Sequence, residues 1–85
     1  MREILKFEAE YCGQCKALTP ILTDVVKDIT LTKVDIETEE ATTLKYNIRS
    51  IPTLVFLKDD KEVGRTTGVL TREALKDKIK EYYGI

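Results

Sequence analysis

Cys12 and Cys15 are the only cysteines of the chain, and two residues separate them in the segment YCGQCK at residues 11–16. A disulfide between them would close a loop of about four residues, for which the entropic stabilisation is near the bottom of the usual range. A purely structural role is therefore a weak explanation of the pair. Chemistry is a better one: the pair could be a redox couple or half of a metal site, or the two thiols could be unrelated neighbours.

A metal site within one chain would need ligands that this sequence scarcely offers. Zinc generally takes four ligands, and the chain has two cysteines and no histidine. Carboxylates would have to complete such a site, or two chains would have to share a zinc ion or a cluster. The shared site stays an alternative, but we assign no metal ligand and expect the domain to need no bound cofactor.

Length and composition limit the class of protein. The 85 residues suffice for one domain, residues 1–85, with a single core, and 42% hydrophobic with 34% charged residues is typical of a globular protein. The 14 basic and 15 acidic residues are spread along the chain, which argues against nucleic acid as the main partner. No apolar run is long enough for a membrane span, and charges interrupt the N-terminus too often for a signal peptide. We therefore expect a cytoplasmic monomer without membrane contact.

Apolar runs, helical periodicity and turn residues together predict seven elements in the order β-α-β-α-β-β-α. Strands are expected at residues 3–9, 31–36, 53–57 and 62–67. The first helix has one apolar face at a 3.6-residue period, formed by Leu18, Ile21, Leu22, Val25 and Ile29. Pro20 lies inside this helix, where it should remove a backbone hydrogen bond and cause a kink.

The second half of the chain completes an α/β fold. A short helix is expected at residues 39–46, and Thr71 is a candidate N-cap for a last helix. Ala74, Leu75, Ile79 and Tyr82 should face inward from that helix, with Tyr83 on the surface. The strand–helix–strand unit predicts a parallel pair, and the later hairpin adds two antiparallel strands. The result is a mixed four-stranded sheet with helices on both faces.

In this arrangement Cys12 lies where the first strand ends and the first helix begins. The first turn of a helix offers unpaired N–H groups and the positive end of the helix dipole, and both favour an anion. A thiolate is such an anion, and it is the nucleophilic form of cysteine. Cys15, one turn further on, is expected to be less exposed and within reach of a mixed disulfide formed by Cys12. A C-x-x-C pair at a strand–helix junction therefore favours the redox couple.

Two separated segments give the chain a resemblance to the thioredoxin family. FEAEYCGQCKALTP at residues 7–20 resembles the thioredoxin active-site segment, including its downstream proline. YNIRSIPT at residues 46–53 resembles the family loop that ends in a cis-proline, and Gly68 fits the glycine of the substrate groove. The likeness covers roughly residues 3–82, without the N-terminal strand and helix of full-length thioredoxins. The chain is thus similar to compact thioredoxin- or glutaredoxin-like proteins of some archaea and phages.

The resemblance implies a thioredoxin-like fold and a thiol–disulfide oxidoreductase that reduces protein disulfides. Cys12 would be the attacking nucleophile and Cys15 the resolving thiol. Pro52 would be cis, although a proline at the start of a strand is more often trans, and it would lie beside the disulfide. The surface that docks protein substrates would be formed by Tyr11, Gly13, Ile51, Pro52, Gly68 and Val69. An NADPH-dependent thioredoxin reductase would supply the electrons.

The sequence departs from the family pattern at positions that tune the site. Tyr11 replaces the usual tryptophan, and Gln14 replaces the usual proline, which leaves the strength of the reductant open. Lys6 stands where thioredoxins bury an acid thought to move the proton of the resolving cysteine. Lys33 matches the lysine that accompanies this acid. Two cations with no carboxylate between them are therefore expected near Cys15.

One hypothesis for these lysines is that Lys6 or Lys33 stabilises the Cys15 thiolate electrostatically, while water carries the proton. The alternative is that Lys6 extends its ammonium group to solvent and plays no part.

Three other functions are weighed against disulfide reduction. Glutaredoxins share the fold, but the glycine pair that binds glutathione is missing, because Val69 follows Gly68. A more oxidising disulfide-exchange protein remains compatible with Gln14. A non-enzymatic binding module is the third alternative, and the intact cysteine pair argues against it.

Overall fold

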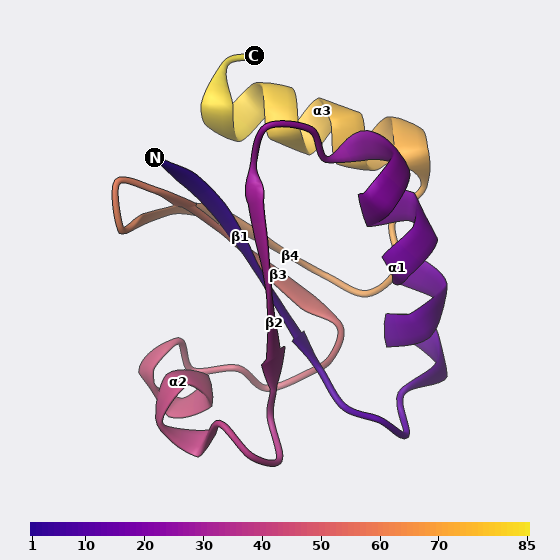
Figure 1. The fold of residues 1–85 in the computed structure, drawn as a ribbon, viewed down its shortest axis with the longest axis vertical. Coiled ribbons are helices and arrows are strands. Elements are labelled where there is room, and N and C mark those ends of the chain that lie inside the picture. The colour runs from indigo at the N-terminus through magenta and orange to yellow at the C-terminus, as the bar shows by residue number, and fades with distance from the viewer.

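The computed structural model describes residues 1–85, which form four strands and three helices in the predicted order (Figure 1). The elements are β1 (Arg2–Glu8), α1 (Gly13–Val25), β2 (Thr30–Asp35), α2 (Glu40–Lys45), β3 (Thr53–Lys58), β4 (Lys61–Thr67) and α3 (Arg72–Tyr83). Every predicted strand and helix is present, and the predicted α/β fold class is confirmed.

The strands form one mixed sheet in the order β2-β1-β3-β4. β1 and β2 are parallel, with Lys6 opposite Lys33. β3 runs antiparallel to both β1 and β4, with Thr53 opposite Phe7 on one side and Thr67 on the other. The end of β1, the start of β3 and the end of β4 consequently meet at one end of the sheet.

The two faces of the sheet carry separate apolar clusters, because successive side chains of a strand point to opposite faces. Helices α1 and α3 cover one face, and α2 with the loop after it lies over the other (Figure 1). The larger cluster, under α1 and α3, comprises Ile4, Leu18, Leu22, Leu54, Phe56, Leu75, Ile79 and Tyr83. The smaller cluster, on the α2 side, comprises Leu5, Phe7, Val34, Val55 and Leu57.

Helix α1 ends earlier than its apolar pattern predicts. It continues through Pro20 and stops at Val25, and Val26 follows with an extended backbone. Asp28 then adopts a positive φ of 59°, which is incompatible with a continuing right-handed helix. Ile29 therefore packs against the larger cluster from the loop that leads into β2, and its assignment to the helical face was wrong.

Tyr83, near the end of α3, also differs from the prediction, whereas Tyr82 packs inward against the larger cluster as predicted. Tyr83 is buried rather than on the surface, and its hydroxyl lies 3.0 Å from the Leu57 carbonyl and 2.9 Å from the Glu3 carbonyl. These backbone acceptors satisfy the hydroxyl, which is why a tyrosine can be buried here. Tyr82 is partly buried, and its ring lies against Gly64, where an added Cβ would stand 2.3 Å from the ring.

None of the three helices combines the length and the hydrophobicity that a bilayer crossing requires.

Candidate active site

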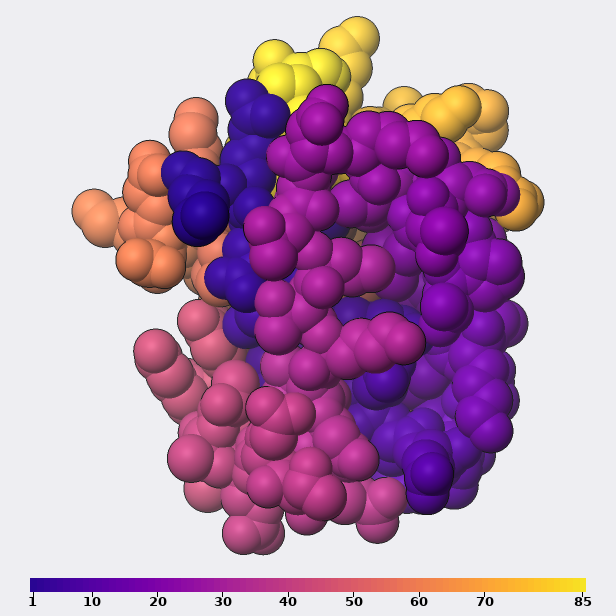
Figure 2. Space-filling model, in the orientation of Figure 1, coloured from indigo at the N-terminus to yellow at the C-terminus, as the bar shows by residue number.

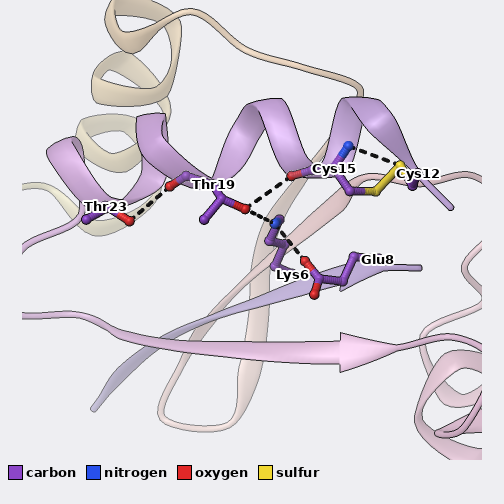
Figure 3. Close-up of polar contacts among 6 residues, drawn as sticks. All are labelled: Lys6, Glu8, Cys12, Cys15, Thr19 and Thr23. Atoms are coloured by element: carbon purple, nitrogen blue, oxygen red, sulfur yellow. Dashed lines mark hydrogen bonds and ion pairs between the residues drawn. A yellow bond between two sulfur atoms is a disulfide. The ribbon is translucent and has the colours of Figure 1, made fainter. Parts of the chain in front are cut away.

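Cys12 and Cys15 form a disulfide at the start of α1 (Figure 3). Cys12 is the N-cap residue of the helix, with an extended backbone, and its Sγ accepts a hydrogen bond from the Cys15 N–H at 3.0 Å. The first turn of α1 contains no acidic residue. The sulfur of Cys12 therefore occupies the position at a helix N-terminus that favours negative charge.

The two cysteines differ in their access to solvent. Cys12 retains 9% of its surface, whereas Cys15 retains 2% and lies deeper under the first turn. Gly13 and Gln14, between them, are exposed. A substrate can therefore approach Cys12 more readily than Cys15.

Three junctions between elements surround the disulfide at one end of the sheet. Cys12 follows β1, Pro52 precedes β3 and Gly68 follows β4. The Ile51–Pro52 peptide bond is cis, as expected, and the Gly68 N–H donates to the Pro52 carbonyl at 2.9 Å. Gly68 has a φ of 81°, a conformation in which glycine carries no penalty.

The backbone of Ile51 is left unpaired beside this junction. Neither its N–H nor its C=O takes part in a backbone hydrogen bond, although the Pro52 carbonyl next to it does. Its side chain lines a hollow of about 180 Å³ together with Tyr11, Ile36 and Ile48. Tyr11 is 71% exposed and Val69 is 44% exposed. The residues that the sequence assigned to substrate docking thus include exposed apolar side chains and a free stretch of backbone.

Lys6 is buried, with 1% of its surface exposed, so the alternative in which its ammonium group extends to solvent was wrong. Its Nζ lies 2.6 Å from Glu8 Oε1 and donates to Thr19 Oγ1 at 2.7 Å. Thr19 Oγ1 in turn donates to the Cys15 carbonyl at 3.3 Å. An unbroken polar chain therefore joins Glu8 on β1 to the backbone of Cys15 on α1 (Figure 3).

The expectation that no carboxylate stands between the two lysines was also wrong. Lys6 and Glu8 are two residues apart on β1, so both point to the face that α1 covers. Glu8 lines a cavity of about 200 Å³ together with Cys15, Thr19 and Lys33. Lys33 lines this cavity from β2, but it is exposed to solvent and forms no ion pair. In Figure 2 the surface between β2 and α1 is hollowed, and atoms of β1 are visible at depth.

The family follows from the comparison with known proteins. The family model described as Thioredoxin matches residues 2–81. The chain belongs to the thioredoxin family. It is 38% identical to a thioredoxin of Chlamydia trachomatis over 82 residues, which cover 93% of this chain and 80% of that protein. It is 39% identical to a thioredoxin of Buchnera aphidicola over 83 residues, or 93% of this chain and 76% of that protein.

Solved structures agree with the family assignment. A mutant thioredoxin from Halobacterium salinarum superposes with a TM-score of 0.87 at 31% identity, over 95% of this chain and 74% of that one. The thioredoxin of Fasciola hepatica superposes with a TM-score of 0.85 at the same identity, over 95% and 80% of the two chains. Cys12–Cys15 is thus the C-x-x-C disulfide of a thioredoxin-family thiol–disulfide oxidoreductase.

Two polar residues of the site were missed by the sequence analysis, namely Glu8 and Thr19. A signal was available for each of them. Glu8 follows Lys6 by two residues, which places both on one face of a strand. Thr19 follows Cys15 by four residues, which places both on one side of a helix. What the sequence alone did not show is that these two pairs face each other across the space between β1 and α1.

The structure contains no group of three or more histidine, cysteine, aspartate or glutamate side chains placed to hold a metal ion.

Proposed function

We propose that this chain reduces disulfides of protein substrates through its C-G-Q-C dithiol, with Cys12 as the nucleophile and Cys15 as the resolving thiol. The observation that carries the proposal is the place of Cys12 Sγ as the cap of α1, 3.0 Å from the Cys15 backbone nitrogen. Once the disulfide is reduced, the same N–H and the helix dipole stabilise a thiolate on Cys12. The greater exposure of Cys12 supports the same division of roles.

The reaction takes place in two exchange steps. The Cys12 thiolate attacks one sulfur of the substrate disulfide, forms a mixed disulfide and releases the other substrate sulfur as a thiolate. The Cys15 sulfur then attacks Cys12 Sγ, which forms the Cys12–Cys15 disulfide and releases the second substrate sulfur. Two electrons pass from the protein dithiol to the substrate, and the released thiolates take up protons.

The surroundings of Cys12 support a protein as the substrate. An extended segment of a partner can pair with the free N–H and C=O of Ile51, as in strand addition to a sheet edge. The exposed ring of Tyr11 and the exposed aliphatic side chain of Val69 would cover apolar side chains of that segment. Gly13 and Gly68 carry no side chain that could obstruct the approach.

Membership of the thioredoxin family supports the remaining parts of the proposal. An NADPH-dependent thioredoxin reductase would return the disulfide to the dithiol, and the protein would act as a cytoplasmic monomer. The protein itself would need no bound cofactor, because the cysteines carry the electrons.

The test is a turbidity assay of insulin reduction, combined with trapping of the mixed disulfide. The wild-type protein should accelerate insulin reduction by dithiothreitol, and Cys12→Ser should fall to the uncatalysed rate. Cys15→Ser should complete the first step only and accumulate a mixed disulfide that mass spectrometry detects. If Cys12→Ser accumulates the mixed disulfide instead, the roles are reversed. Failure of the wild-type protein to accelerate the reaction would contradict the proposal and favour a binding module.

The reduction potential separates a reductant from an oxidant. Equilibration in graded thiol–disulfide buffers should give a potential near the thioredoxin value of about −270 mV. A potential near about −180 mV would instead indicate an oxidising or glutaredoxin-like exchange protein.

A further inference from the structure

The resolving thiol must be deprotonated in a buried position. Cys15 must lose its proton before it can attack Cys12, yet only 2% of its surface reaches solvent. A buried thiol has little thiolate character in apolar surroundings. An internal group that accepts the proton would remove this obstacle.

We propose that Glu8, held in place by Lys6, accepts the proton of Cys15 during the resolving step. The inference rests on the proposed function, since it concerns the second of the two exchange steps. Glu8 and Cys15 line the same cavity of about 200 Å³, which is large enough for several water molecules at about 30 Å³ each. In this proposal the proton passes from the thiol to the carboxylate through water within this cavity.

The contacts of Lys6 determine its role as a positioning residue. Its buried ammonium group forms an ion pair with Glu8, with Nζ 2.6 Å from Oε1, and donates a hydrogen bond to Thr19 Oγ1 at 2.7 Å. Thr19 is anchored to the Cys15 carbonyl at 3.3 Å. Lys6 thereby fixes the carboxylate of Glu8 relative to the turn of α1 that carries Cys15 (Figure 3). An ammonium group cannot itself accept a proton, so this function falls to Glu8.

Glu8 is also suited to return the proton to bulk water. Its side chain is 25% exposed, whereas that of Lys6 is 2% exposed. One carboxylate oxygen of Glu8 therefore contacts Lys6, while part of the same side chain remains accessible to solvent.

The step conserves atoms and charge. The Cys15 thiol transfers its proton to the Glu8 carboxylate, and the resulting thiolate attacks Cys12 Sγ. The Cys15–Cys12 bond forms as the bond between Cys12 and the substrate sulfur breaks. The substrate leaves as a thiolate that is protonated by solvent, and Glu8 then releases its proton to water.

Other charged groups face the same cavity and define the controls. They are Glu10 from the loop after β1, Lys16 from α1, and Lys33 and Asp35 from β2. Glu10 and Asp35 are carboxylates that line the cavity without an ion pair to Lys6. Asp35→Asn keeps the oxygen that accepts from the Glu37 N–H, so it is a conservative control.

The experiment is a stopped-flow reaction of the reduced protein with a stoichiometric amount of an aromatic disulfide that releases thionitrobenzoate. The first phase, whose rate depends on the concentration of the aromatic disulfide, reports the attack by Cys12. The second phase, whose rate is independent of that concentration, reports resolution by Cys15. Glu8→Gln should slow the second phase by about 10²-fold near neutral pH and leave the first phase within a factor of about two. Glu10→Gln and Asp35→Asn should leave both phases unchanged.

The pH profile distinguishes proton transfer from a structural effect. In the wild type the second phase should be nearly independent of pH around neutrality, because the acceptor is internal. In Glu8→Gln its rate should rise about tenfold per pH unit, because hydroxide must remove the proton. Added formate should accelerate this variant, and Glu8→Asp should lose less rate than Glu8→Gln.

A double variant covers the case in which Glu8→Gln fails to fold because it leaves the Lys6 charge unpaired. Lys6→Met/Glu8→Gln removes both charges, and its second phase should be as slow as that of Glu8→Gln, because the two residues act as a unit. A normal second phase in either variant would overturn the inference, as would an equal slowing by Asp35→Asn. Absence of the first phase in the wild type would instead contradict the proposed function.

Discussion

Helix α1 presents two neighbouring rows of side chains to the sheet, and their chemistry differs. Leu18 and Leu22 form an apolar row that is completely buried against Ile4 and the rest of the larger cluster. Cys15 and Thr19 form a polar row beside it, directed at the Lys6–Glu8 pair. Both rows have the same four-residue spacing, and both are opposite β1. The same two elements thus build a core with one row and a candidate site with the other.

The difference indicates which row serves stability and which serves chemistry. Buried apolar contacts stabilise a fold by removing surface from water. A buried ion pair commonly contributes little, because the loss of hydration offsets the attraction between the charges. The Lys6–Glu8 pair as a whole could be replaced by uncharged residues of similar volume with little loss of stability, so its presence beside Cys15 is better explained by the reaction.

The largest effect on stability is expected in the apolar row. Leu22→Ala should lower the free energy of unfolding by about 2–5 kcal/mol, because it opens a cavity in the packed cluster. Urea denaturation monitored by circular dichroism would measure the change. The second, resolving phase should keep its rate in the folded fraction. A slower resolving phase at normal stability would contradict the separation of the two rows.

A much smaller effect on stability is expected at the Lys6–Glu8 pair that faces the polar row. Lys6→Met/Glu8→Gln should change the free energy of unfolding by less than about 2 kcal/mol, with no change or a gain favoured over a loss. The same denaturation experiment applies, paired with the stopped-flow assay described above. If this variant loses as much stability as Leu22→Ala, the Lys6–Glu8 pair is structural and the comparison fails.

The smallest effect on the free energy of unfolding is expected at the surface ion pair Glu62–Arg65, which contrasts with the buried Lys6–Glu8 pair. Arg65 holds Glu62 through two hydrogen bonds of 2.6 and 2.8 Å, and these bonds lower the pKa of Glu62. Because the pKa is lower in the folded state, the stabilisation is present above the ordinary glutamate pKa of about 4.3 and is lost as the pH falls through the folded value. Both side chains are about a third exposed, so solvent screens the pair.

Glu62→Gln should therefore destabilise the protein by less than about 1 kcal/mol at neutral pH. Thermal unfolding at a series of pH values would measure it. The difference between variant and wild type should disappear in acid, and the resolving phase should be unaffected at every pH. A difference that grows as the pH falls would contradict the assigned sign.

Local patterns made the fold largely predictable. Apolar runs located the strands, and a 3.6-residue apolar period located the two longer helices, because these elements need an apolar face toward the core. The short helix α2 was assigned from a polar segment, and it buries no residue. The prediction of Thr71 as the N-cap of α3 is confirmed, since its hydroxyl accepts from the Ala74 N–H at 3.1 Å. The errors lie at helix ends, where Ile29 and Tyr83 take positions that tertiary contacts decide.

The disulfide site was predictable for a related reason. Cys12 and Cys15 are close in sequence, and the helix that begins between them fixes their geometry. The family resemblance of the segment around Pro52 added the cis peptide bond, which no local propensity would have indicated.

The sequence by itself determined the elements, their order and the position of the cysteine pair at a strand–helix junction. Only the tertiary structure decided the surroundings of Cys15. Lys6 was expected to be an isolated cation or a side chain that extends to solvent, and it is a buried ammonium group bound to Glu8 and Thr19. The physical reason is that each partner is placed by its own element, and the distance between them depends on how β1 and α1 pack. Sequence spacing determines which side chains share a face, whereas packing determines which faces meet.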